Sequence, residues 1–333
     1  MFKQPYVLDI IVRRIEPVER ILTKLFGVPP IPMHPDMDPT HTLVGTHYTT
    51  QGLYSVGLLG LRDPDREYNP KLPTEANAWA MQHKLRRIGE GPSLLGCLVD
   101  DIDQHVADLR KQGVRFIGDE PRRYLVGRNL PVDPATSFGA EILYAQHDPD
   151  AYAAWIATDP SRAPKDVKTS PRKIYSISVA VRDLAAAVPV FEQLIESKAY
   201  PMRPEIDLAG DLVGAHFPTA GIDSFQVVAL REPSRRYAPP EVDPTHVGAW
   251  LVQRHLDTRG EGYFQMGLLV DDLDADTSAL KAEGIKFLLD TPLRYAVGRT
   301  NVVDPASTHG VTVSLAQHDP AAYQRWRKRW AIG

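Results

Sequence analysis

The sequence predicts an α+β fold of two tandem domains with curved, mixed β-sheets, and three observations support this. The chain has 333 residues, whereas a single domain usually has about 100–200. The residues from Val126 to Trp155 recur from Val297 to Trp326, at an offset of 171, with 16 identities in 30 positions. Within each copy, apolar residues alternate in some segments and recur every three or four residues in others, which indicates both strands and helices.

The repeat also sets the expected domain boundaries. The offset is 169 nearer the start of each copy, where the residues from Val44 to Thr50 match those from Val213 to Thr219. Between the copies, residues 161–172 carry proline, serine and charges without an apolar period, which is typical of a linker. We therefore expect an N-terminal domain over 1–160, a linker over 161–172 and a C-terminal domain over 173–333.

Each copy reads as two βαβββ units, so the chain should contain four. The first copy predicts strands over 6–12, 43–50, 52–61, 94–101, 114–118, 129–133 and 140–146, with helices over 18–27 and 103–113. The second predicts strands over 174–181, 212–219 and 223–230 and a helix over 185–196. The repeated His-Asp-Pro sequence at His147 and His318 predicts the start of a terminal helix in each copy. No glycine-rich dinucleotide fingerprint follows any strand, which argues against a Rossmann sheet.

Composition limits the classes of partner. Lys and Arg total 38 and Asp and Glu total 42, giving a net charge of −4, and no run of five basic residues occurs. We therefore expect no nucleic-acid partner. No apolar run is long enough to span a membrane, and the early charges do not suit a signal peptide, so we expect a cytoplasmic protein. The lone Cys97 excludes an internal disulfide and a multi-cysteine zinc site. The expected partner is a small-molecule substrate, and the chain is expected to be a monomer or a homodimer.

Two segments of the second copy resemble one known superfamily. The run from Arg259 to Phe287 contains Gly-Glu-Gly, a strand, Val-Asp-Asp-Leu-Asp and a helix, and the closing strand follows Val302. These motifs resemble the vicinal oxygen chelate superfamily, which includes glyoxalases, bleomycin-resistance proteins, methylmalonyl-CoA epimerases and extradiol dioxygenases. A chain of four units is most similar to the extradiol dioxygenases. The resemblance implies glyoxalase-like domains with U-shaped clefts and an enzyme of aromatic catabolism.

The resemblance also implies a divalent metal held by two histidines and a glutamate in a cleft. In the C-terminal copy, those positions are Ser176, Gln265 and Ser314, and in the N-terminal copy they are Val7, Leu94 and Leu143. Serine and glutamine are poor metal ligands, and valine and leucine are none. We therefore expect the standard metal triad to be missing. Ser176, Gln265 and Ser314 would instead hydrogen-bond substrate oxygen atoms, or they are polar residues tolerated in a vestigial cleft.

One histidine matches a catalytic position of the extradiol dioxygenases. The segment 212–230 resembles the strand pair that carries a proton-moving histidine beside the substrate, which assigns that role to His216. Histidine suits acid–base catalysis because its ordinary pKa of about 6.5 leaves both forms available near neutrality. His47 is the copy in the first repeat. A histidine that both copies keep can instead serve the fold.

Three further residues are expected at the mouth of the C-terminal cleft. Tyr295, Arg299 and Asn301 precede the closing strand, and we expect them to contact substrate. The Arg299 guanidinium could pair with an anionic group. Because Arg128 repeats it in the first copy, a salt bridge that holds the loop is the alternative.

The sequence supports three functional hypotheses. The first is an enzyme acting on an oxygenated aromatic or carbonyl substrate by lyase, isomerase or hydrolase chemistry, with His216 as acid–base and without the standard metal. The second is a ligand-binding protein, like the bleomycin-resistance members, that performs no catalysis. The third is a metal-dependent enzyme whose iron, manganese or zinc has moved to Asp9, His47 and Glu141, which should face the N-terminal cleft.

Overall fold

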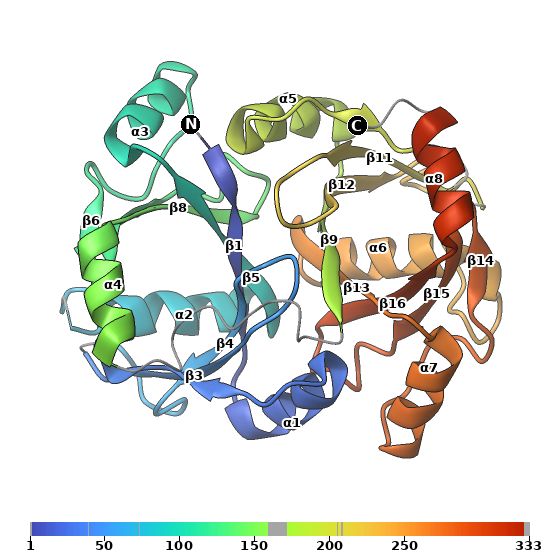
Figure 1. Cartoon of the computed structure of the whole chain (residues 1–333), viewed down its shortest axis with the longest axis horizontal. Coiled ribbons are helices and arrows are strands. Elements are labelled where there is room, and N and C mark those ends of the chain that lie inside the picture. Colours follow the sequence, from blue (N-terminus) through green and yellow to red (C-terminus); the bar gives the residue numbers. More distant parts are fainter. Residues whose placement is uncertain are drawn as a thin grey trace.

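The computed structural model describes residues 2–38, 40–72, 74–158, 172–204, 206–207 and 209–329. Each copy of the repeat forms one curved eight-stranded sheet (Figure 1). The first sheet contains β1 (Phe2–Ile11), β2 (Ile31–Pro32), β3 (Leu43–Tyr48), β4 (Ser55–Leu61), β5 (Gly91–Val99), β6 (Arg122–Tyr124), β7 (Gly127–Pro131) and β8 (Glu141–His147). The second contains β9 (Lys173–Ala180), β10 (Tyr200–Pro201), β11 (Leu212–Phe217), β12 (Ser224–Leu230), β13 (Gly262–Leu269), β14 (Leu293–Tyr295), β15 (Gly298–Val303) and β16 (Thr312–His318). The predicted α+β class is confirmed.

Both sheets have the same mixed topology. The strand orders are β2-β3-β4-β1-β5-β8-β7-β6 and β10-β11-β12-β9-β13-β16-β15-β14. In the second sheet, β9 runs parallel to β12 and antiparallel to β13, and β13 runs parallel to β16. The two units of each copy therefore meet at their opening strands, in the middle of the sheet. Side chains from both units consequently lie next to one another on the same face.

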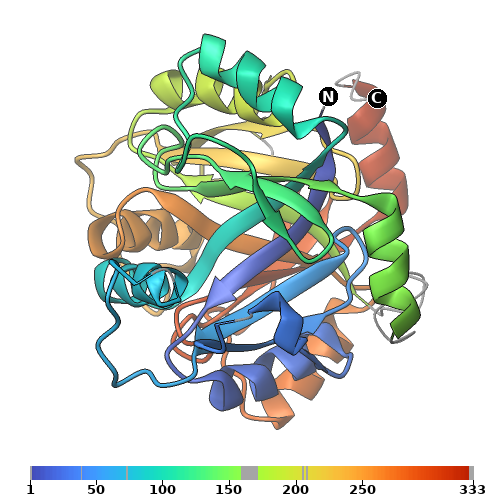
Figure 2. The same cartoon turned by 90° about the vertical axis from the view of Figure 1, so that its left-hand side faces the viewer.

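A helix follows the opening strand of each unit and covers the sheet from outside. These helices are α1 (Ile15–Phe26), α3 (Ile102–Lys111), α5 (Leu184–Ile195) and α7 (Leu273–Ala282). The side chains of Asp183 and Asp272 accept hydrogen bonds from backbone N–H groups in the first turns of α5 and α7, which caps both helices. Helix α1 ends at Gly27, whose φ of 67° suits glycine. Figure 2 shows α3 near α5 and α1 near α7, so the outer helices of the two copies meet.

Two helices lie inside the curves of the sheets. They are α2 (Ala76–Arg87) and α6 (Val247–Thr258), which follows the short 3₁₀ turn η4 (Pro244–His246); a similar turn, η1 (Pro35–Met37), lies in the first copy. The sequence does not predict α2 or α6. The terminal helices α4 (Pro149–Thr158) and α8 (Pro320–Arg329) begin where His-Asp-Pro predicts, and Asp148 Oδ1 accepts hydrogen bonds from the N–H groups of Asp150 and Ala151.

The predicted strand over 114–118 is wrong. That segment makes only an isolated bridge between Phe116 and Val132, and the strand of the unit is β6 instead. Gly118 has a φ of 112°, a left-handed conformation that interrupts an extended chain. Of the expected linker over 161–172, only Arg172 belongs to the described residues.

One apolar core joins the two sheets. It contains Ile10 and Leu95 from the middle of the first sheet and Ile177 and Met266 from the middle of the second. Two tyrosine hydroxyls cross the boundary: Tyr144 donates to Leu194 O at 2.6 Å, and Tyr263 donates to Glu141 O at 3.0 Å. The concave faces therefore point away from the shared core. None of the described helices is long and apolar enough to cross a membrane.

Candidate functional site

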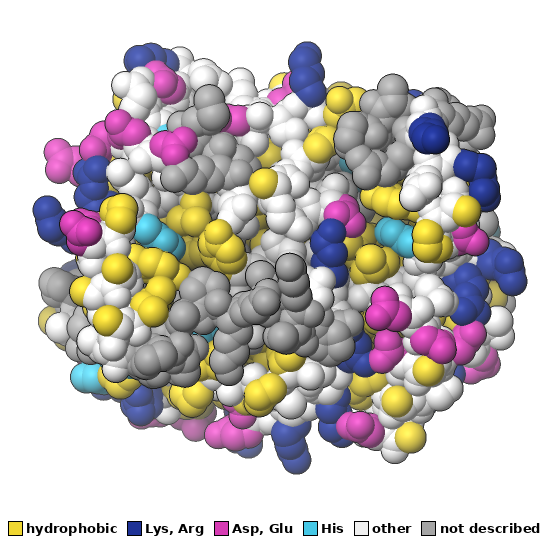
Figure 3. All heavy atoms as spheres, viewed as in Figure 1, with side chains coloured by type: hydrophobic (Ala, Val, Ile, Leu, Met, Phe, Trp, Pro, Cys, Tyr) yellow, Lys and Arg dark blue, Asp and Glu magenta, His cyan; other side chains and the backbone are white. Residues whose placement is uncertain are grey.

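A cavity of about 490 Å³ lies on the concave side of the second sheet. Its floor consists of β9, β12, β13 and β16, and its walls are α6, α8, β14 and the segment after β10. The lining is mostly apolar. Figure 3 shows hydrophobic side chains gathered around a histidine in this half of the molecule. A cavity of this size with a few polar groups suits a small organic molecule.

A row of serines crosses the floor of the cavity. Ser224 on β12 is in register with Ser176 on β9, Ser176 with Gly267 on β13, and Gly267 with Ser314 on β16. The three serines line the cavity, and Ser176 and Ser314 are almost fully buried. Gly267 lies between Ser176 and Ser314 and has no side chain that would separate them.

A second polar row runs beside the first. His216 on β11 is in register with Gln226 on β12, Gln226 with Ser178 on β9, and Ser178 with Gln265 on β13. The Ser178 hydroxyl donates to Gln226 Oε1 at 3.1 Å. The fold thus brings His216, Gln265, Ser176 and Ser314 to one cavity. Their roles in binding and catalysis stay predictions.

One ring nitrogen of His216 contacts Ser224 on the neighbouring strand, and the other has no hydrogen-bond partner among the described residues. Its Nδ1 lies 2.8 Å from Ser224 Oγ, and that hydroxyl is placed to donate to Phe225 O at 3.3 Å. This arrangement favours a proton on Nδ1 and a lone pair on Nε2. Nε2 is buried and has no hydrogen-bond partner among the described residues. Burial, with a contribution from the nearby Arg203 charge, lowers the pKa of His216 to about 4, so the ring is neutral near neutral pH.

An aromatic ladder forms the wall nearest α8. The ring of His318 lies edge-on to Tyr175 at 5.5 Å and to Tyr295 at 6.3 Å, and it stacks on Tyr323 at 4.9 Å. Tyr323 in turn stacks on Trp326 at 6.3 Å. All five side chains line the cavity. Tyr295 therefore belongs to the cavity lining, and its buried hydroxyl has no partner among the described residues; a contact with substrate stays a prediction.

The structure places Arg299 and Asn301 outside the cavity lining. The Arg299 guanidinium donates to Asp274 Oδ2 and Gln317 Oε1, at 2.8 and 2.7 Å, so the salt bridge is the arrangement present. Asn301 is fully buried; its Nδ2 donates to Leu289 O at 3.1 Å. Both side chains hold the closing strands together.

Sequence reasoning missed several residues that line the cavity. Arg203, Leu251, Phe264 and Trp326 all do so. The repeat offered a signal for Trp326, because Trp155 is its copy. Arg203 gave none, since the matching residue of the first copy is His34 and the surrounding loop differs.

The residues at the superfamily's metal positions do not fit a divalent metal. Ser176, Gln265 and Ser314 offer two hydroxyls and an amide, without a carboxylate or an imidazole. Among residues that the structure describes, no three His, Cys, Asp or Glu side chains form a group that could hold a metal ion. No step of a mechanism is therefore routed through a metal.

The concave face of the first sheet carries charges instead of a neutral floor. His47 on β3 is in register with Gly57 on β4, Gly57 with Asp9 on β1, Asp9 with Leu94 on β5, and Leu94 with Glu141 on β8. The three residues of the displaced-metal hypothesis thus share one row. Gly57 and Leu94 separate them, and in the described part of the chain the three side chains do not form a group that could hold a metal ion.

Lys84 of α2 supplies the cation in this N-terminal cleft. Its ammonium group is ion-paired with Glu141 and lies 3.4 Å from Ser93 Oγ. Burial raises the pKa of Asp9 to about 7; Glu141 adds to the rise and Lys84 opposes it. In the second copy the matching residues are Ser178, His255 and Thr312, which leave that floor open and neutral.

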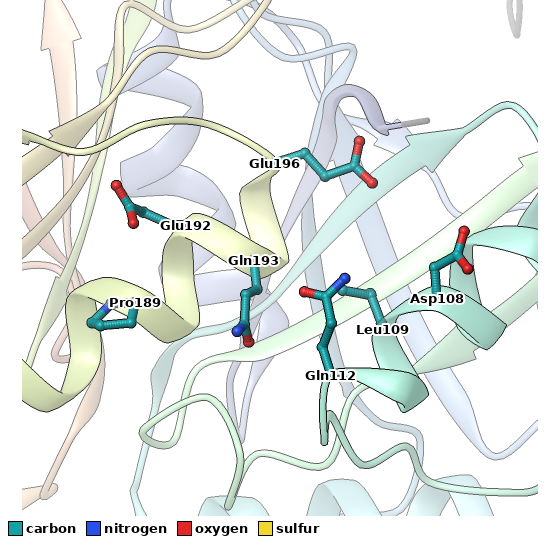
Figure 4. Close-up of a pocket in the computed structure, with 7 residues that line it drawn as sticks. All are labelled: Asp108, Leu109, Gln112, Pro189, Glu192, Gln193 and Glu196. Carbon is teal, nitrogen blue, oxygen red and sulfur yellow. The ribbon is translucent and has the colours of Figure 1, made fainter.

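A second hollow, of about 370 Å³, lies between α3 and α5 (Figure 4). Asp108, Glu192 and Glu196 line it, together with glutamine side chains. It lies on the outer side of both sheets, away from the polar rows, so the concave cavity is the candidate site.

Comparison with known proteins supports the fold. No family model and no curated protein matches the chain. Among solved structures, a triple mutant of 4-hydroxymandelate synthase from Streptomyces coelicolor aligns over 96% of this chain and 93% of its own, with a TM-score of 0.62 and 12% identity. The chain has the fold of the vicinal oxygen chelate superfamily.

Two methylmalonyl-CoA epimerases align with part of the chain. Methylmalonyl-CoA epimerase from Mycobacterium tuberculosis matches 46% of this chain and 91% of its own, at 21% identity and a TM-score of 0.37. The Streptomyces coelicolor epimerase matches 44% of this chain and 96% of its own, at 20% identity and a TM-score of 0.35. The predicted pair of glyoxalase-like domains is confirmed by the full-length match.

Proposed function

We propose that the C-terminal cavity is the active site of a small-molecule enzyme that moves a proton, with His216 Nε2 as the base and without the superfamily's metal. The observation that carries the proposal is the Nε2 atom of His216, which is buried and has no partner among the described residues, in a side chain that lines a mostly apolar cavity. Buried nitrogen atoms are normally hydrogen-bonded, so an unpartnered one calls for an explanation such as a catalytic role.

The neutral imidazole suits the role of proton acceptor. Because the pKa of His216 lies near 4, almost every molecule carries a free lone pair at neutral pH. The cationic Arg203 is close enough to lower that pKa, so it is also close enough to stabilise an anion formed at the same place. Ser176, Gln265 and Ser314 offer hydrogen bonds to substrate oxygen atoms. Isomerase or lyase reactions of an oxygenated aromatic or carbonyl compound need this set of groups.

A general probe tests the base without knowledge of the substrate. 5-Nitrobenzisoxazole is a flat bicyclic carbon acid: a base removes its ring C–H proton, that electron pair forms a C≡N bond, and the N–O bond breaks to give a coloured phenolate. We expect wild-type protein to accelerate the reaction, and His216→Gln to lose at least about 10²-fold of that acceleration. The rate should rise as pH increases through about 4 and stay level above it, because deprotonation of His216 is then complete.

The repeat provides a matched control for this experiment. His47→Gln changes the equivalent histidine of the first copy and should leave the rate unchanged. An equal loss in both variants, or a rate that rises near pH 6.5, would contradict a base at His216. Stoichiometric iron, manganese or zinc in the purified protein, required for the rate, would contradict the metal-free proposal.

Ligand binding without catalysis is the second candidate. It is favoured by the low pKa of His216, since a base this weak gains little from proton transfer. Saturable binding of 5-nitrobenzisoxazole with no acceleration above buffer would support it.

A further inference from the structure

We propose that the C-terminal cavity selects ligands of opposed polarity: a two-ring aromatic compound with an acidic hydroxyl at one end and a neutral acceptor, such as a carbonyl, at the other. The hydroxyl would meet His216 on the sheet, and the acceptor would meet Tyr295 and Trp326 at the ladder. This inference rests on the proposed function of the same cavity and names the chemistry of its ligand.

The sheet end of the cavity lacks a hydrogen-bond donor for His216. Nδ1 lies 2.8 Å from Ser224 Oγ, and when Nδ1 donates to that hydroxyl, which is placed to donate in turn to Phe225 O, the lone pair is on Nε2. A ligand hydroxyl that donates to Nε2 would satisfy this buried acceptor.

The ladder end of the cavity lacks a hydrogen-bond acceptor. The Tyr295 hydroxyl and the Trp326 indole N–H are both buried and have no partner among the described residues. Indole nitrogen only donates, and burial raises the pKa of Tyr295, so its phenol keeps its proton. Two donors without an acceptor call for a carbonyl-type oxygen on the ligand, since an unpartnered buried donor is costly.

Between the two ends, the wall formed by α6 is apolar and the sheet floor is polar. Leu251 and Val247 of α6 and Phe264 of β13 offer apolar surface, and the serine and glutamine side chains of the floor lie on the strands between His216 and Tyr295. Flat rings pack well against such walls. A volume of about 490 Å³ exceeds what a single ring needs and accommodates a two-ring compound.

The first copy repeats this tyrosine but not the polar floor beside it. The hydroxyl of Tyr124, the copy of Tyr295, is likewise buried without a hydrogen-bond partner among the described residues. Val7 and Leu143 stand there in place of Ser176 and Ser314. Because Tyr124 lies outside the C-terminal cavity, Tyr124→Phe removes an equivalent hydroxyl and is the matched control for Tyr295→Phe.

Three fluorescent naphthalenes test the inference by equilibrium titration. 6-Acetyl-2-naphthol carries both groups, 2-acetyl-6-methoxynaphthalene lacks the hydroxyl donor, and 6-ethyl-2-naphthol lacks the acceptor. We expect the first to bind at least about fivefold more tightly than either of the others. Tyr295→Phe should weaken binding of the two acetyl compounds about fivefold and leave 6-ethyl-2-naphthol unchanged. His216→Leu should weaken only the two naphthols.

The outcomes separate this inference from the proposed function. Equal affinities for the three compounds, or equal losses in Tyr295→Phe and Tyr124→Phe, would overturn the opposed-polarity inference even if 5-nitrobenzisoxazole is turned over. The expected pattern of affinities without any turnover would support the inference and overturn only the enzymatic proposal. Circular dichroism of each variant verifies that it is folded.

Discussion

At the scale of the residue, Gly267 leaves room on the cavity floor for the side chains beside it. It lies between Ser176 and Ser314 in the serine row, and a Cβ atom there would lie 2.3 Å from Ser176 Oγ and 2.7 Å from Tyr175 Cε1. The need for glycine is thus one of space. Its copy, Gly96, is equally crowded, with Val7 Cγ1 at 2.4 Å from the same hypothetical atom.

This crowding predicts that one added methyl group at Gly267 lowers both stability and ligand affinity. Gly267→Ala should lower the free energy of unfolding by about 1–3 kcal/mol, as overpacking does. It should also weaken binding of 6-acetyl-2-naphthol, because the displaced Tyr175 ring enters the cavity. Gly96→Ala should cost similar stability and leave the affinity unchanged. Urea unfolding and fluorescence titration measure the two effects, and an equal loss of affinity in Gly96→Ala would contradict the assignment of the site to the second sheet.

The predicted site residues that the structure brings together lie on paired strands. Ser176, Gln265, Ser314 and His216 reach one cavity because a period of two and a repeated topology determine which strand residues share a face. Arg203 was not predictable in this way. It follows β10 in a loop whose position depends on the whole domain, and the first copy has His34 there.

At the scale of the element, the inner helices show why the two copies differ. Helix α6 has buried residues on most of its circumference, including Ala249, Val252 and His255, because it lies within the curve of the sheet. A helix buried in this way has no single apolar stripe, so its period is hard to read from sequence. Its counterpart α2 places Lys84 where α6 has His255, and that exchange accompanies the charged floor of the first copy.

The ion pair between Lys84 and Glu141 predicts that substitutions at these two residues have non-additive effects on stability. Lys84→Met should lower the free energy of unfolding by about 3 kcal/mol at neutral pH, because it leaves the buried Glu141 carboxylate unpaired. Glu141→Gln in the same molecule should restore most of that loss. Lys111→Met, which removes an exposed pair with Asp108, should change stability by less than about 0.5 kcal/mol. Additive effects of Lys84→Met and Glu141→Gln in urea unfolding would contradict the coupling.

At the scale of the whole molecule, the duplication yields two sheets around one core. A shared core leaves each concave face free to diverge, so one copy carries a cavity with an uncharged floor and the other an ionic cluster. Sequence comparison of the copies revealed the repeat and its length. It did not reveal that the copies share a core, because the contacts between them, such as Tyr144 with Leu194, join residues that do not match across the repeat.

Arg172 links the two copies, and it predicts how the protein unfolds. Its Nη1 donates to Lys24 O and Leu25 O, at 2.6 and 2.5 Å, and its Nη2 is ion-paired with Asp276 of α7. Because the core is continuous, we expect one calorimetric transition whose measured enthalpy equals its van't Hoff enthalpy. Arg172→Met should lower the free energy of unfolding by about 3 kcal/mol, since it strips partners from buried carbonyl groups and from Asp276.

Arg236→Met is the control for this prediction, because it removes only an exposed pair with Asp257 and should change stability by less than about 1 kcal/mol. Two resolved transitions in the wild-type protein would show that the copies unfold independently, and would contradict a single core. A loss in Arg172→Met no larger than in Arg236→Met would show that the link at Arg172 contributes little. One wild-type transition together with a larger loss in Arg172→Met would show that the two copies unfold as one unit and that Arg172 stabilises the contact between them.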